Sequence, residues 1–159
     1  MIGLLRLAAV LLVIPAVDDA AKPSDDLARH QGTWAVERSI RDGKDGPTEV
    51  MKEIVRVVDG NRIVWKRAGK SFAATTFELD PAADPKTIDL IPEGGRNRGD
   101  RVLGIYRFDD DRLVLCTADP GKPRPLSFAA EPGDGQTLMT FRRKVLDADT
   151  PEATSRPRE

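Results

Sequence analysis

Gly32-Thr33-Trp34 opens the first strand-like run of the chain, and Arg142-Arg143 closes the last one. Between these two motifs, short apolar runs alternate with tight-turn residues such as Gly, Pro, Asn and Asp, a pattern typical of strands joined by hairpins. In a closed barrel of this kind, a Trp on the first strand can plug one end while an Arg from the last strand lies across its ring. Such a cation–π contact contributes about 0.5–2 kcal/mol, depending on how well it is shielded from water.

The structural closure of the barrel is assigned to Gly32, Trp34 and Arg143. Successive side chains of a strand point to opposite faces, so Arg143 shares a face with Phe141, whereas Arg142 points away from it. We therefore expect Arg143 to be the partner of the Trp34 ring.

Residues 31–146 are expected to form an all-β domain, an antiparallel up-and-down β-barrel of about eight strands. Most connections are too short to cross between two sheets, which favours sequential hairpins over a sandwich. Closure of the sheet also removes exposed strand edges. A short helical lead-in is expected over residues 21–30.

Several details of this barrel follow from the sequence pattern. A strand is expected from Glu49 to Val58 and a short one from Leu126 to Ala130, so that every aromatic residue lies in a strand. On the first strand, a period of two places three apolar side chains on one face: Trp34, Val36 and Ile40.

The two ends of the chain are set apart from the barrel. Residues 1–20 are typical of a signal peptide, because Arg6 precedes an apolar run over residues 7–17 that is too short to span a membrane. Cleavage is expected near Ala20-Ala21, which predicts an exported protein, periplasmic or extracellular. Residues 147–159 carry many charges and two prolines, and a disordered tail is expected there.

Charge and cysteine content narrow the possible partners. The chain has 25 Lys and Arg against 26 Asp and Glu, and removing residues 1–20 leaves 24 of each sign. This balance argues against nucleic-acid binding and against stable association with an anionic membrane after signal removal. Cys116 is the only cysteine, so no internal disulfide can form, and it is expected to be a small structural side chain.

Several motifs together resemble a paralogous family of lipocalin-like, calycin-type domains of unknown function that is abundant in planctomycetes. The resemblance covers about Leu27 to Lys144 and implies a lipocalin-like barrel, export in many members, and no established ligand or activity. His30 departs from the family pattern, which usually has an apolar residue there. The motifs are Leu27 to Trp34, Asp84-Pro85-Lys86-Thr87-Ile88-Asp89, Gly104-Ile105-Tyr106, Leu113-Val114-Leu115-Cys116, Arg124-Pro125 and Phe141-Arg142-Arg143.

No catalytic, cofactor-binding or metal-binding residue is assigned. His30 is the sole histidine, precedes the barrel and has no second ligand nearby in the sequence. A His-based metal site or catalytic triad is therefore not expected. Asp109-Asp110-Asp111 lacks the further oxygen ligands that Ca²⁺ requires and is interpreted as a solvated hairpin turn.

Two polar segments remain open to interpretation. The motif over residues 84–89 either forms a polar cluster at the barrel rim or serves the structure, with Pro85 fixing the corner and Asp89 satisfying backbone donors or Lys86. The Gly- and Arg-rich segment 93–101 is a flexible loop, or in a sharper hypothesis a lid over the barrel mouth.

The leading hypothesis is an exported barrel that binds a small apolar or amphipathic ligand in its interior. The alternative is a filled barrel that serves as a cell-envelope protein-interaction or inhibitor module through residues 41–48, 93–101 and 118–125. An enzyme is disfavoured, because the inward titratable candidates Arg38, Glu78 and Asp89 are scattered in the sequence. Small residues at 73, 75 and 117 leave room for a ligand, and the candidate ligand-binding residues are Trp65, Phe77, Ile88, Tyr106, Leu115 and Phe128.

Overall fold

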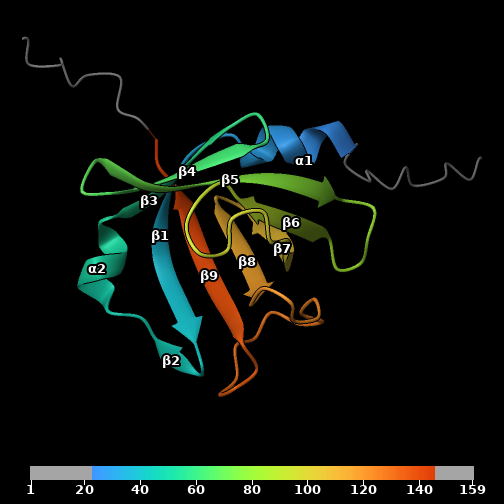
Figure 1. Ribbon diagram of the computed structural model, residues 1–159. Coiled ribbons are helices and arrows are strands. Elements are labelled where there is room, and N and C mark those ends of the chain that lie inside the picture. The colour runs from blue at the N-terminus through green and yellow to red at the C-terminus, as the bar shows by residue number, and fades with distance from the viewer. Residues whose placement is uncertain (1–22, 146–159) are drawn as a thin grey trace, which may run out of the picture.

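The computed structural model describes residues 23–145 (Figure 1). The signal peptide expected over residues 1–20 and the tail expected over 147–159 lie outside the described residues. The elements are α1 (Pro23–His30), β1 (Gly32–Arg41), β2 (Lys44–Asp45), α2 (Thr48–Lys52), β3 (Ile54–Asp59), β4 (Arg62–Arg67), β5 (Lys70–Asp80), β6 (Thr87–Pro92), β7 (Val102–Asp109), β8 (Arg112–Ala118) and β9 (Gln136–Arg143).

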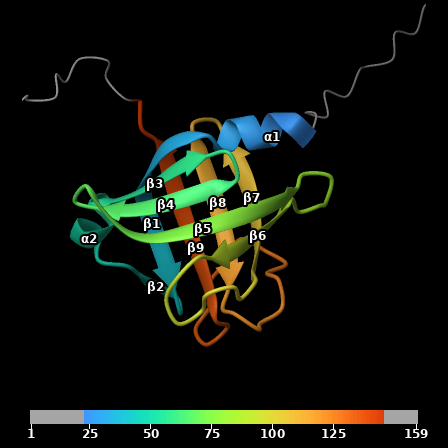
Figure 2. The same ribbon diagram turned by 45° about the horizontal axis from the view of Figure 1, so that its top comes forward.

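The strands form one antiparallel sheet that closes on itself. From β3 to β9 each strand pairs with the next in sequence, while β1 pairs with β3 on one side and β9 on the other. β2 is a two-residue extension beside the end of β1. The predicted all-β, up-and-down barrel of about eight strands is therefore confirmed. In Figure 2, β3, β4 and β5 cross in front of β1, β9 and β8, so these two parts of the closed sheet face each other.

Helix α1 covers one end of the barrel, as Figure 2 shows at the top of the view. Gly32 follows this helix with a φ of 95°, a left-handed conformation that favours glycine, and so lets the chain turn from α1 into β1. The opposite end is bounded by the last residues of β1, the start of β9 and the connections between β6 and β7 and between β8 and β9. We refer to the two as the closed end and the open end.

Most of the barrel interior is occupied by one apolar cluster. Its side chains alternate along each strand with outward ones, as expected for strands with one buried face. The fully buried members are Trp34, Val36, Val58, Ile63, Phe77, Ile88, Tyr106, Leu113, Leu115 and Phe141.

A β-bulge on β1 corrects the expected pattern of that strand. Val36 pairs with Phe141 but Arg38 pairs with Thr140, so Glu37 is an extra residue without a partner on β9. The extra residue reverses the alternation beyond it. Ser39, opposite inward-facing Met139, therefore takes the interior position, and Ile40 lies on the outer face instead of sharing the face of Trp34.

Two of the predicted strands are wrong at least in part. The strand expected from residue 49 begins only at Ile54, because the N–H groups of Val50 and Met51 bond to the carbonyl oxygen of Pro47 and form the short helix α2. No strand forms over residues 126–130. That segment belongs to the β8–β9 connection and lies against the outside of the barrel, since the Cys116 Sγ donates to the Ala129 carbonyl at 3.1 Å.

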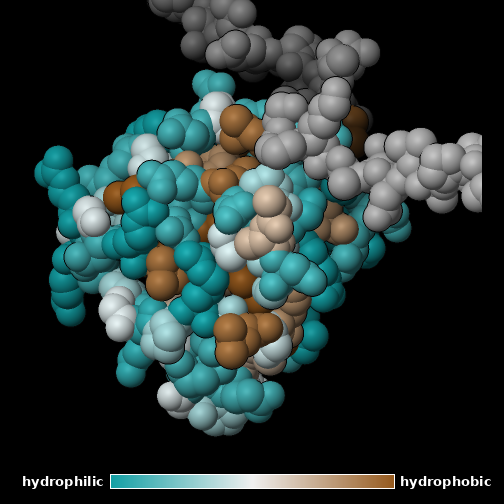
Figure 3. Space-filling model, turned by 90° about the vertical axis from the view of Figure 1, so that its right-hand side faces the viewer, coloured by the Kyte–Doolittle hydropathy of each residue, from teal (hydrophilic) through white to brown (hydrophobic). Residues whose placement is uncertain are grey.

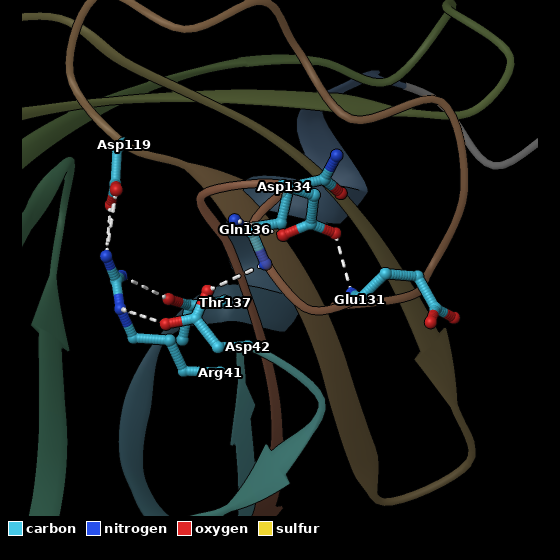
Figure 4. A network of polar contacts seen from close by, with 8 residues as sticks. Arg41, Asp42, Asp119, Glu131, Asp134, Gln136 and Thr137 are labelled. Carbon is cyan, nitrogen blue, oxygen red and sulfur yellow. Dashed lines mark hydrogen bonds and ion pairs between the residues drawn. The ribbon is translucent and has the colours of Figure 1, made fainter.

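The β8–β9 connection is fixed to the barrel by arginines. Arg124 donates to the carbonyl oxygens of Gly104 at 2.7 Å and Ile88 at 3.3 Å, and pairs with Asp89 at 2.7 Å. At the open end, Arg41 bonds to both carboxylate oxygens of Asp119, at 2.9 and 2.8 Å, and to the Thr137 hydroxyl at 3.0 Å (Figure 4). These contacts hold the connection over a second, outer apolar layer that includes buried Ile105, Val114, Cys116 and Ala118.

Candidate functional site

The closed end is built around Trp34. Its ring is 1% exposed, and its Nε1 donates to the His30 carbonyl at 2.9 Å. The Arg143 guanidinium carbon lies 4.2 Å from the ring centroid, and the two residues are direct cross-strand partners. Arg142 points outward and pairs with Glu37 at 3.0 Å. Of the two adjacent arginines, Arg143 is therefore the one that covers the plug.

His30 is a structural part of the closed end. It is fully buried, and its ring centroid lies 5.5 Å from that of Phe77 and 4.9 Å from those of Tyr106 and Phe108. Burial, followed by the charge of nearby Arg56, lowers the pKa of His30 to about 2, so the imidazole is neutral in the folded protein. Its Nδ1 lies 3.4 Å from Arg56 Nη2, while its Nε2 is buried without a hydrogen-bond partner.

A second polar contact joins α1 to the barrel. Asp26 is fully buried and accepts from the Tyr106 hydroxyl at 2.7 Å and from Lys86 Nζ at 2.8 Å. Burial, and secondarily the bond to Asp26, raises the pKa of Tyr106 well above its ordinary value, so the phenol stays protonated. Asp89 instead lies on the outer face, where it pairs with Arg101 and Arg124. The motif over residues 84–89 thus anchors the helix and the β8–β9 connection and does not form one rim cluster.

The open end carries an apolar pocket of about 340 Å³. This mouth pocket is hollowed between the ends of five strands, β1, β3, β4, β5 and β9, and helix α2. It includes Phe72, which is 59% exposed and is the extra residue of a second bulge, since Trp65 pairs with Ala73 and Lys66 with Ser71. Bulges are common at barrel rims, where they redirect side chains. The lining residues are Ser39, Met51, Ile54, Trp65, Phe72, Ala73, Thr137 and Met139.

The six candidate ligand-binding residues divide into three groups. Trp65 lines the mouth pocket. Four others face inward and are buried members of the core cluster: Phe77, Ile88, Tyr106 and Leu115. Phe128 is wrongly placed in the interior by the sequence pattern. It lies in the β8–β9 connection, with the exposed side chain of Arg107 4.6 Å above its ring.

Most of the pocket was missed for identifiable reasons. Met51 falls within the strand expected from Glu49, where the structure has helix α2 instead, and the bulge at Glu37 turns Ser39 to the interior. Ile54 and Met139 do follow inward alternation, so they could have been included on the sequence alone. The segment 93–101 leaves the barrel at the open end, but none of its residues lines the pocket, which lends no support to a lid.

The three inward titratable candidates for an enzyme all lie on the outside. Arg38 follows the β1 bulge and pairs with Asp45 at 2.6 Å, both largely exposed. Glu78 alternates with inward Phe77 and, like Asp89, binds Arg101 on the outer face. The structure therefore does not bring these three groups together inside the barrel.

The remaining candidate positions have ordinary structural surroundings. Burial raises the pKa of the Cys116 thiol, which is the opposite of what an activated nucleophile requires. In the acidic turn between β7 and β8, Asp109 pairs with Arg107 at 3.0 Å and Asp111 lies 3.6 Å from Arg142. Within residues 23–145 no three His, Cys, Asp or Glu side chains are grouped as metal ligands.

On the face shown in Figure 3, apolar side chains emerge in small groups set among hydrophilic ones. No helix in the described part of the chain is long and apolar enough to cross a membrane. Comparisons of the chain with protein-family models, curated proteins and solved structures find no match.

Proposed function

We propose that this chain is an exported, non-enzymatic barrel that binds a small apolar or amphipathic molecule at its open end. The observation that carries the proposal is the mouth pocket, whose volume lies in the range of small-molecule sites, about 300–1,000 Å³. Its lining is mainly apolar and includes the side chains of Met51 and Met139. Met side chains are flexible and adapt to ligands of different shape.

The support for export is the sequence of residues 1–20, and the support for membership of the planctomycete lipocalin-like family is the set of motifs quoted above. Expression of the full chain in a bacterial host tests export directly, because signal cleavage near Ala20-Ala21 would remove a defined mass from the protein recovered from the periplasm or medium. An uncleaved protein that stays in the cytoplasm would contradict it.

The binding proposal is tested with Nile red, a neutral apolar dye whose emission reports transfer out of water. Ala73→Phe adds a ring to the pocket wall, whereas Ser71→Phe adds the same ring to the outer face of β5. We expect Nile red to bind the wild-type protein, Ala73→Phe to weaken binding at least about tenfold, and Ser71→Phe to change it less than about twofold. Equal effects of both variants would place the dye elsewhere.

Native mass spectrometry of protein purified without detergent tests the same proposal without a probe. A discrete adduct that disappears on denaturation would give the mass of a natural ligand. If neither an adduct nor dye binding is found, the result favours the alternative, a filled barrel that serves as a cell-envelope interaction or inhibitor module and contacts its partner through its loops.

A further inference from the structure

Arg56 is a fully buried arginine inside the barrel. It lies on β3, with Trp34 as its cross-strand partner on β1 and Trp65 as its partner on β4. The residue is 0% exposed, and it shares the inward face of β3 with Ile54 and Val58. An arginine in such a position is uncommon, because charged side chains are almost never fully buried unless they are paired.

The guanidinium is largely without partners. Its Nη2 lies 3.4 Å from His30 Nδ1, and its Nε and Nη1 are buried with no hydrogen-bond partner. No carboxylate among residues 23–145 is within ion-pair distance of it. Aromatic faces surround it instead, with the guanidinium carbon 5.6 Å from the Phe141 centroid and 6.0 Å from that of Phe77.

The charge is retained in this environment. Burial lowers the pKa of Arg56 to about 9, which still leaves the guanidinium protonated at neutral pH. A buried cation without a counter-charge is strongly unfavourable, while a guanidinium fork matches the oxygens of a carboxylate. The neighbouring His30 Nε2 is a second buried nitrogen without a partner. Together the Arg56 guanidinium and His30 Nε2 form a buried, positively charged site without an anionic partner among the described residues.

The site lies next to the mouth pocket. Ile54, two residues before Arg56 on the same face of β3, lines the pocket, and so does Trp65, its cross-strand partner. The Phe141 ring connects the two regions, with its centroid 6.0 Å from that of Trp65 and 5.6 Å from the Arg56 guanidinium carbon. A head group that enters beside this ring would bring its oxygens to Arg56 and leave its apolar chain in the pocket.

We propose that the ligand of the mouth pocket is a single-chain amphiphile with a small anionic head group, a carboxylate, held by Arg56. The proposal rests on the proposed function and adds the charge and polarity of the ligand to it. It also requires the side chains between the pocket and Arg56 to shift on binding, so that the indole of Trp65 changes its surroundings.

Competition against Nile red by decanoate and by decan-1-ol tests the proposal, since the two probes differ in the head group alone. We expect the wild-type protein to prefer decanoate by at least about tenfold, the effect of a charge-assisted hydrogen bond. Arg56→Met keeps an unbranched apolar stem and should lose this preference while still binding the alcohol. Arg62→Met removes the same charge from the outer face of β4 and should keep it.

The outcomes separate the two proposals. If the wild-type protein neither binds Nile red nor carries a natural adduct, the proposed function fails. If the dye binds but decanoate and decan-1-ol compete equally, or if Arg56→Met retains the preference, the function stands and the role of Arg56 is overturned.

A second measurement needs no variant and therefore does not depend on Arg56→Met being folded. Decanoate labelled isotopically at its carboxyl carbon is bound to the wild-type protein and titrated by NMR. Contact with Arg56 would lower the pKa of the bound carboxyl below that of free decanoate, whereas an apolar site without a cation would raise it. A raised pKa would overturn the proposal.

Discussion

The Arg143 guanidinium lies 4.2 Å from the centroid of the Trp34 ring, and the same side chain donates to the carbonyl oxygens of Gln31 at 2.7 Å and Arg29 at 2.6 Å. One residue therefore covers the plug of the barrel and satisfies carbonyl groups at the carboxyl end of α1, where a cation is favoured by the helix dipole. The first and last strands and the helix that closes the barrel are all joined through this contact.

Trp34→Ala tests the importance of the plug. The ring is almost completely buried and its removal leaves a cavity, so we expect the free energy of unfolding to fall by about 3–5 kcal/mol. Urea unfolding monitored by circular dichroism measures this change. A loss below about 1 kcal/mol would show that the ring does not act as the plug.

Arg143→Lys tests the planar fork. Lysine retains the charge but cannot lie flat over Trp34 while bonding to two carbonyl groups, so we expect a loss of about 1 kcal/mol. Arg142→Lys is the matched control, because its pairing with Glu37 is on the surface and should contribute less than about 0.5 kcal/mol. Equal losses in the two variants would contradict the assignment of Arg143 to the closure.

Gly104→Ala tests the close approach of β7 to β8. A Cβ at this position would lie 2.9 Å from the Cys116 carbonyl oxygen, a backbone atom held in the sheet, and 3.0 Å from the Thr117 side-chain atom Cγ2. We expect a destabilisation of about 1–3 kcal/mol from the overpacking. Gly94→Ala provides the control, since nothing lies within 4 Å of the added carbon. The melting temperature of each variant is the readout, and an unchanged value for Gly104→Ala would be the contrary result.

Tyr106→Phe tests the anchoring of α1. The substitution keeps the ring among its aromatic neighbours and removes only the hydroxyl, which donates a hydrogen bond to the Asp26 carboxylate at 2.7 Å. Buried Asp26 then has Lys86 as its remaining partner, so we expect a loss of about 1–3 kcal/mol. Hydrogen exchange of the α1 amides should increase along with the loss in urea stability. Unaltered exchange would mean that the bond does not anchor the helix.

Alternation along the strands was enough to predict the barrel and much of its core. Phe77, Ile88, Tyr106 and Leu115 are inside because their strands run without an extra residue between them and the closed end. The closure by Trp34 was predicted from the resemblance of its motif to those of lipocalin-like barrels, and alternation selected Arg143 over Arg142 as its partner.

The mouth pocket could not be derived in the same way. An extra residue such as Glu37 or Phe72 has no distinctive local sequence signal, yet it reverses every later position on its strand. Phe128 shows a related limit, because a short apolar run can pack against the outside of a barrel under a long connection as well as form a strand. Arg56 is a charged residue at an inward position of β3, where alternation of apolar and polar side chains predicts an apolar one. Only its burial in the structure identifies it as a candidate site.

The pH dependence of stability tests the burial of His30. Its pKa is about 2 when folded and near 6.5 when unfolded, so between these values the unfolded chain binds one proton more. The contribution of the neutral imidazole is therefore fully present above about pH 6.5 and is lost as the pH falls, by about 1.4 kcal/mol per pH unit. His30→Leu has no such proton to bind. From pH 6 to pH 4 the unfolding free energy of the wild-type protein should therefore fall more than that of His30→Leu. The titration of carboxylates lowers the stability of both proteins equally and cancels in the comparison. Parallel pH profiles for the two proteins would mean that His30 is accessible to protons in the folded state.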